Sequence, residues 1–136
     1  VKDATGDLNR AEQQRKAMGD KFIMLTGEDG NALEFNKKSG SGCISVTANV
    51  AAKLCSEMQN ASLEKNNINL QEIAEEINKM LTPLNKALFI ESNPSPVKYA
   101  ASLLKLSPDE VRLPLVRITD PTKSAVKKAL EHALLI

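Results

Sequence analysis

The stretch VKDATGDLNR at the start of the sequence holds the side chain with the clearest chemical potential. Lys2 stands between the apolar Val1 and a turn-like DATG segment. A lysine amine can attack a carbonyl carbon when its surroundings lower the pKa of the ammonium group. A solvated surface lysine is nevertheless the ordinary interpretation of any lysine. From the residues alone, both interpretations of Lys2 stay open.

The cysteines and the histidine do not form a recognisable metal site. Cys43 and Cys55 are too far apart for a CxxC pair, and His132 is the one histidine of the chain. Structural zinc sites need several such ligands at characteristic spacings. We therefore expect reduced thiols and no metal site.

Composition and charge limit the class of protein. A chain of 136 residues, with 42% hydrophobic and 26% charged residues, is in the range of one ordinary globular domain. The net charge of +1 creates no field that would attract nucleic acid or an anionic membrane. Apolar runs such as 22–25 and 87–90 are far shorter than the roughly 20 residues of a membrane span. We expect a soluble, cytoplasmic protein with neither partner.

Glycine and proline divide the chain into two parts. All six glycines lie within the first 42 residues, and all six prolines follow position 82. In the first part, short apolar runs at Val1, from Phe22 and from Gly42 are typical of buried strands. The stretches 7–19 and 31–40 between them look helical, and each ends in a glycine suited to a left-handed cap. The alternation predicts parallel βα units.

The second part has helical periodicity throughout. One helix is expected from Asn49, and a longer one carries an apolar stripe interrupted by Pro83. The stripe consists of Leu70, Ile73, Ile77, Met80, Leu84 and Leu88. The pairs Ser95-Pro96 and Asp120-Pro121 predict the starts of two more helices, with Ser95 and Asp120 as N-caps.

Three open parallel strands cannot close a barrel by themselves. A compact doubly wound domain is the physical alternative, but it would alternate strands and helices to its end. A (β/α)8 TIM barrel needs about 250 residues. We therefore predict the C-terminal portion of a TIM barrel, with its last three βα units in residues 1–65, followed by a C-terminal helical region in residues 66–136.

Several motifs, in order along the chain, resemble the dihydrodipicolinate synthase family of pyruvate-dependent class I aldolases. They are VKDATGDL, LTGEDG, GCISVTANVAAKLCSEM, LTPLNKALFIESNPSPVKYA and VRLPL. The resemblance covers essentially the whole chain and concerns the C-terminal half of the family's barrel. SVTANV and ESNPSPVKYA are similar to the synthase branch rather than to the sialic acid lyases.

The resemblance implies a role for Lys2 and a reaction. Lys2 would form a Schiff base with pyruvate, in a buried, apolar barrel interior that lowers its pKa. The enamine would then attack aspartate semialdehyde, giving 4-hydroxy-tetrahydrodipicolinate for lysine and diaminopimelate biosynthesis. No metal or organic cofactor is implied. Another aldolase of the same family is the alternative reaction, and the complete protein would be a homotetramer.

Three further residues match positions that bind substrate in this family. Gly27 and Glu28 would form a turn that contacts the second substrate, although the family commonly has aspartate where Glu28 stands. A solvated loop acid is the alternative for Glu28. Ile44 would line the pyruvate pocket with its backbone carbonyl group while its side chain packs in the core.

The resemblance places other functional groups in the N-terminal half of the barrel, which this sequence lacks. These are the proton-relay tyrosines and threonine, the arginine for the substrate carboxylate and the lysine feedback site. Tyr99 does not match the catalytic tyrosines. The sequence leaves open a fragment, one piece of a split protein or a decayed relic, and also a noncatalytic interaction module. We expect the chain alone to be inactive.

Overall fold

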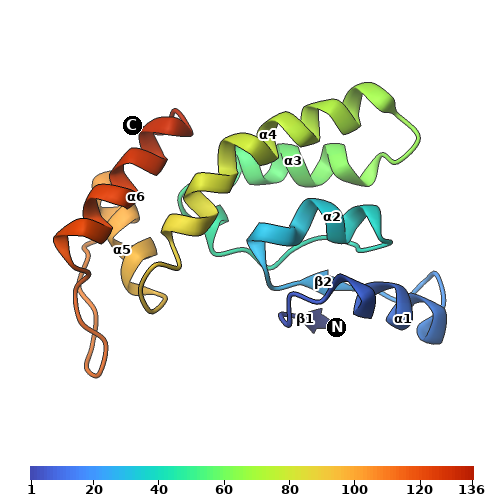
Figure 1. Cartoon of the computed structure of the whole chain (residues 1–136), viewed down its shortest axis with the longest axis horizontal. Helices are drawn as coiled ribbons and strands as arrows, with labels where there is room; N and C mark the ends of the chain where they lie inside the picture. The colour runs from blue at the N-terminus through green and yellow to red at the C-terminus, as the bar shows by residue number, and fades with distance from the viewer. The chain divides into compact units, whose positions relative to one another are not determined.

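The computed structural model describes residues 1–136 and divides into two compact units (Figure 1). Unit 1 comprises residues 1–45 and 54–78, and unit 2 comprises residues 46–53 and 79–136. The barrel and helical regions predicted for residues 1–65 and 66–136 concern a different division of the chain, and that boundary stays a prediction.

Unit 1 contains a small parallel sheet, as the alternation of strands and helices predicts. Strand β1 (Lys2–Asp3) pairs with β2 (Leu25–Thr26) in the register Lys2 to Leu25. The expected third strand is represented by a parallel bridge from Thr26 to Cys43. Backbone hydrogen bonds from Thr26 N to Gly42 O (3.0 Å) and from Ile44 N to Thr26 O (2.8 Å) flank this bridge. The strands are shorter than expected, but their order and direction are confirmed.

Helices α1 (Leu8–Met18) and α2 (Ala32–Lys37) follow the two strands, with a 3-10 turn, η1 (Asp29–Asn31), before α2. Asp7 begins α1 by accepting a hydrogen bond from Asn9 N at 2.9 Å. Met24 of the β2 segment packs in a small core between the two helices. The core members are Ala11, Met24 and Phe35, with Leu8 and Phe22 against them.

The two helix-ending glycines act differently. Gly19 has φ +79°, as expected for the residue that ends α1. Gly40 does not have a positive φ, and Ser39 takes that conformation (φ +74°) after α2 instead. Gly40 is required for space, because a Cβ there would lie 2.6 Å from the Phe35 carbonyl oxygen. The prediction of a left-handed glycine cap is therefore right for α1 and wrong for α2.

Helices α3 (Ala52–Leu63) and α4 (Ile68–Ala87) complete unit 1 and lead into unit 2. Helix α4 continues through Pro83. The buried stripe differs from the predicted one, because Ile73 is 44% exposed and the small Ala74 is buried in its place. The stripe that is buried consists of Ala74, Ile77, Leu81, Leu84 and Leu88.

Unit 2 contains the 3-10 turn η2 (Thr47–Asn49), the end of α4, and helices α5 (Ser95–Leu103) and α6 (Asp120–His132). These helices were expected, but their caps lie one residue earlier. Pro94 precedes α5, and Thr119 precedes α6. Glu91 Oε1 accepts hydrogen bonds from Thr119 N (3.0 Å) and Thr119 Oγ1 (2.7 Å), which fixes the start of α6.

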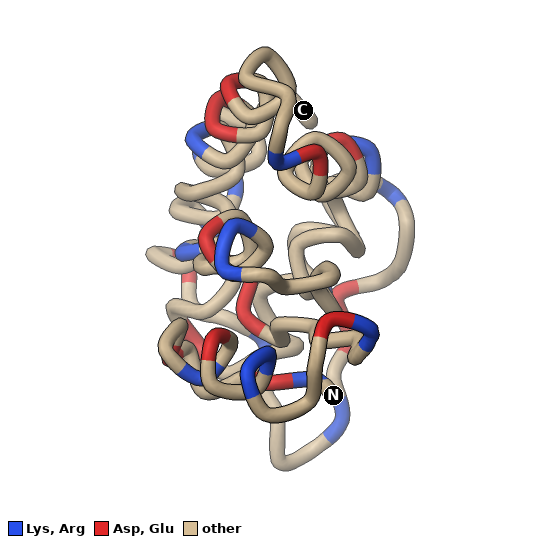
Figure 2. The backbone as a smooth tube through the Cα atoms, turned by 90° about the vertical axis from the view of Figure 1, so that its right-hand side faces the viewer, with Lys and Arg blue, Asp and Glu red and all other residues tan.

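Acidic and basic residues are interspersed along the backbone (Figure 2). Several of them connect helices within unit 1. Lys38 pairs with Glu12, which links α2 to α1, and Lys37 pairs with Glu75 at 2.5 Å, which links α2 to α4. None of the helices combines the length and the hydropathy that a bilayer crossing requires.

The carboxylate of Asp3 connects β1 to α1. It accepts hydrogen bonds from Thr5 N (2.9 Å), Thr5 Oγ1 (2.6 Å), Arg10 Nε (2.7 Å) and Gln14 Nε2 (2.9 Å). The Thr5 hydroxyl and then the Arg10 guanidinium hold the pKa of Asp3 far below its ordinary value. Because successive strand side chains point to opposite faces, Lys2 projects from the face opposite α1.

We expect Asp3→Asn to lower the melting temperature by about 5 °C at pH 7, since the loss of charge weakens several hydrogen bonds at once. The Asp3 pKa is lowered by folding, so its contribution is complete above the unfolded pKa of about 3.9 and declines as pH falls below it. The difference between variant and wild type should therefore shrink towards pH 3. Calorimetric melting at both pH values checks this.

The matched control for this experiment is Asp20→Asn, at an exposed carboxylate after α1 that takes part in no ion pair. It should change the melting temperature little at either pH. An Asp3→Asn effect as large at pH 3 as at pH 7 would contradict the account of the Asp3 hydrogen bonds.

Candidate active site

The four residues selected from the sequence lie at one end of the parallel sheet of unit 1. Lys2 belongs to β1, Gly27 and Glu28 follow β2 directly, and Ile44 follows the bridged Cys43. Parallel strands end at the same edge of a sheet, and active sites of α/β barrels are assembled at this edge. The fold thus brings together residues that are far apart in the sequence.

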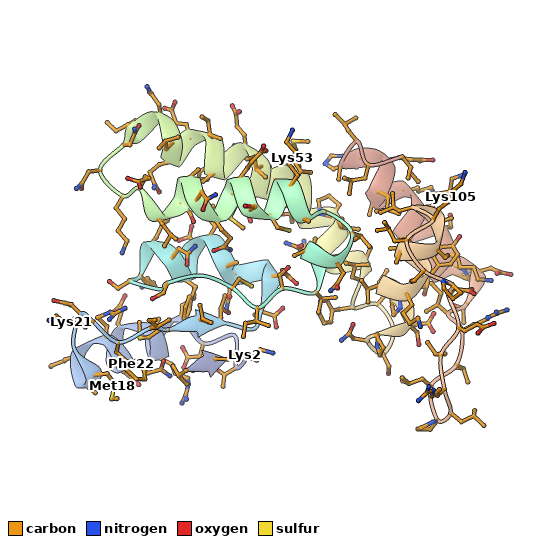
Figure 3. All side chains as sticks on the ribbon, turned by 180° about the vertical axis from the view of Figure 1, so that it is seen from behind. Lys2, Met18, Lys21, Phe22, Lys53 and Lys105 are labelled. Carbon is orange, nitrogen blue, oxygen red and sulfur yellow. The ribbon has the colours of Figure 1, made fainter.

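The side chain of Lys2 lies along the neighbouring strand, β2. Its backbone is level with Leu25, but its Cε lies beside Gly27, where a Cβ atom would be only 2.5 Å away. The Lys2 side chain is exposed, and Figure 3 shows its amine directed away from the ribbon. The apolar interior expected around Lys2 would be a property of the closed barrel and stays a prediction.

The backbone around Ile44 leaves an acceptor at the ends of the strands. Ile44 N donates to Thr26 O, so the next acceptor of a parallel ladder would be the Ile44 carbonyl oxygen. Its ladder donor would be Glu28 N, which instead donates to Thr26 Oγ1 at 3.1 Å. The Ile44 side chain is 49% exposed, so the expectation of a core side chain is wrong. The backbone carbonyl group of Ile44, which accepts no hydrogen bond from the neighbouring strand, can accept one from a ligand.

Buried polar groups lie beneath this edge. Asp29 is 6% exposed, and Asp29 Oδ1 accepts hydrogen bonds from Ser45 Oγ and, at 3.9 Å, from Cys43 Sγ. Burial, followed by the charge of Asp29, raises the pKa of Cys43 to about 12. Burial likewise raises the pKa of Cys55 to about 11. Neither thiol is therefore a nucleophile at neutral pH.

Sequence reasoning did not select Asp3 or Asp29, although both anchor the site. The DAT sequence of an aspartate followed two residues later by threonine is a signal for the turn that Asp3 makes. The second acid of the GEDG segment is Asp29, and its burial depends on Ser45, which is distant in the sequence. The structure contains no cluster of three or more His, Cys, Asp or Glu side chains arranged to hold a metal ion.

Comparisons with known proteins agree with this geometry. The sequence model of the "Dihydrodipicolinate synthetase family" matches residues 1–133. A 4-hydroxy-tetrahydrodipicolinate synthase of Pelagibacter ubique is 60% identical over the whole of this chain, and one of Methylobacterium radiotolerans is 52% identical. The chain spans 46% and 44% of the lengths of these two relatives.

Solved structures show the same fold. A dihydrodipicolinate synthase from Aquifex aeolicus is 33% identical, with a TM-score of 0.90 over 98% of this chain and 44% of its own. The chloride-inhibited enzyme from Acinetobacter baumannii, complexed with pyruvate, is 34% identical, with a TM-score of 0.91 over 100% of this chain and 45% of its own. The chain has the fold of the C-terminal part of these TIM-barrel enzymes. It belongs to the dihydrodipicolinate synthetase family.

Proposed function

We propose that this chain supplies the Schiff-base lysine of a lyase that condenses pyruvate with aspartate semialdehyde to 4-hydroxy-tetrahydrodipicolinate. The observation that carries the proposal is the position of Lys2 on β1, with its side chain extending to Gly27 at the carboxyl end of β2. The carbonyl group of Ile44, which accepts no hydrogen bond from the neighbouring strand, belongs to the same end of the sheet. The names of the relatives and the pyruvate complex of the Acinetobacter enzyme support the choice of reaction.

The chemistry begins with the amine of Lys2. Its nitrogen attacks carbon 2 of pyruvate, and loss of water gives a protonated imine. The positive nitrogen makes the methyl group acidic, so loss of a methyl proton gives an enamine. The enamine carbon attacks the aldehyde carbon of aspartate semialdehyde. The amine of that substrate then displaces Lys2 from carbon 2, which closes the ring and regenerates the free lysine.

The neighbouring residues bind rather than react in this scheme. The Ile44 carbonyl oxygen accepts a hydrogen bond from the pyruvate-derived intermediate, and the Gly27–Glu28 turn receives the second substrate. We place the proton relay in the part of the barrel outside this chain, so residues 1–136 alone are inactive. The complete protein is a cytoplasmic homotetramer, with its barrel portion ending near residue 65 and a helical region after it.

Trapping with pyruvate and borohydride tests the role of Lys2 in the full-length protein. Reduction fixes the imine as a stable adduct, which peptide mass spectrometry should locate on Lys2. Lys2→Arg should remove the adduct and nearly all turnover, because a guanidinium group stays protonated. The control Lys21→Arg, at an exposed lysine outside the site, should retain both. An adduct on Lys53, Lys98 or Lys105 would contradict the assignment.

Complementation tests whether the nucleophile and the proton relay lie in different halves of the barrel. Residues 1–136 should show no synthase turnover alone, because they carry the nucleophile without the proton relay. Mixing them with the N-terminal half of the Pelagibacter relative should restore turnover, and the Lys2→Arg fragment should not. Turnover by residues 1–136 alone would refute the proposed division, and failure of every mixture would favour a noncatalytic module.

Light scattering tests the proposed assembly. The full-length protein should have the mass of a homotetramer at micromolar concentration. A strict monomer at that concentration would contradict the proposal while leaving the chemistry of Lys2 unaffected.

A further inference from the structure

A side chain at position 27 would overlap two neighbouring side chains as they stand. A Cβ atom there would lie 2.5 Å from Lys2 Cε and 2.8 Å from Ala4 Cβ. Carbon atoms that are not bonded prefer separations of about 3.5–4.0 Å. The space that a side chain would occupy at position 27 is therefore filled by the lysine stem and by the methyl group of Ala4.

The backbone of Gly27 does not itself require glycine. Gly6, Gly19 and Gly42 have positive φ angles, but Gly27 does not. Its amide belongs to the sheet, because Gly27 N donates to Asp3 O at 2.8 Å. Because φ of Gly27 is outside the left-handed region, alanine could adopt this backbone, and the close approach of Lys2 and Ala4 is what opposes a side chain.

The contact also shows the direction of the lysine stem. Lys2 pairs with Leu25, yet its Cε meets Gly27, two residues further along the parallel strand. At about 3.3 Å per residue, this offset is about 6.6 Å towards the carboxyl end of the sheet. The stem therefore lies along β2 and carries the amine towards the carboxyl end of the sheet, where Ile44 follows the bridged Cys43.

We propose that Gly27 is a positioning residue for Lys2: its bare Cα is the surface on which the lysine stem rests, and this directs the amine to the ends of the strands. The inference rests on the proposed function, since it concerns the geometry of the same nucleophile. It assigns Gly27 a role towards the lysine in addition to its expected contact with the second substrate.

The test uses Gly27→Ala in the full-length protein, with two companion variants. Ala4→Gly combined with Gly27→Ala removes the overlap with Ala4 and leaves only the overlap with the lysine stem. Gly30→Ala is the matched control, because its Cβ would meet nothing closer than 4.0 Å and its φ is not positive. Calorimetric melting of each variant establishes that it folds.

Two measurements report on Lys2: the position of its side chain and its rate of imine formation. Ligand-free crystal structures should show the Lys2 stem displaced from residue 27 in the double variant relative to the wild type. Rapid-quench borohydride trapping should show imine formation at saturating pyruvate slowed about 100-fold, as expected for a misplaced reacting group. The pyruvate concentration at half saturation should stay within about twofold, because the loss concerns the attack rather than binding. Gly30→Ala should match wild type in both measurements.

The outcomes separate this inference from the proposed function. A wild-type protein that forms no adduct would overturn the proposed function, and the positioning role of Gly27 with it. Adduct formation by wild type, together with an unchanged rate or an unmoved lysine stem in the folded double variant, would overturn the inference about Gly27 alone. A slowed rate with a displaced stem and unchanged half saturation supports it.

Discussion

The parallel register of Lys2 with Leu25 is the constraint on which the site depends. This pairing aligns the end of β1 with the end of β2, so Lys2 lies on the strand next to the one that Gly27 follows. The bridge from Thr26 to Cys43 aligns the third segment in the same way. A shift of one residue would turn Lys2 to the helix-covered face, since side chains alternate along a strand. The register therefore decides which face carries the amine.

Polar groups on the helix-covered face of the sheet stabilise this register. Asp3 joins the end of β1 to α1 through Thr5, Arg10 and Gln14, so the residue next to Lys2 has little freedom. Asp29 performs a similar task beneath the third segment by accepting a hydrogen bond from Ser45. The carboxylates of Asp3 and Asp29 thus support the backbone, and the open face is left for the lysine and the Ile44 carbonyl group.

The sequence predicted most of the elements because their signals are local. Asp7 and Gly19 bound α1 as expected, and the order of strands and helices followed from the spacing of apolar runs. Predictions failed where distant contacts decide the structure. Phe35 fills the space beside Gly40, and the exposure of Ile44 depends on the strands around it. The roles of the site residues came from family resemblance, because residue type alone could not distinguish Lys2 from a surface lysine.

A crystal structure of the full-length protein grown with pyruvate would show directly whether Lys2 forms the imine. We expect continuous electron density from Lys2 Nζ to carbon 2 of pyruvate, with the lysine stem lying across Gly27 and the Ile44 carbonyl oxygen within hydrogen-bond distance of the intermediate. Pyruvate bound without a covalent bond, or bonded to a different lysine, would contradict it.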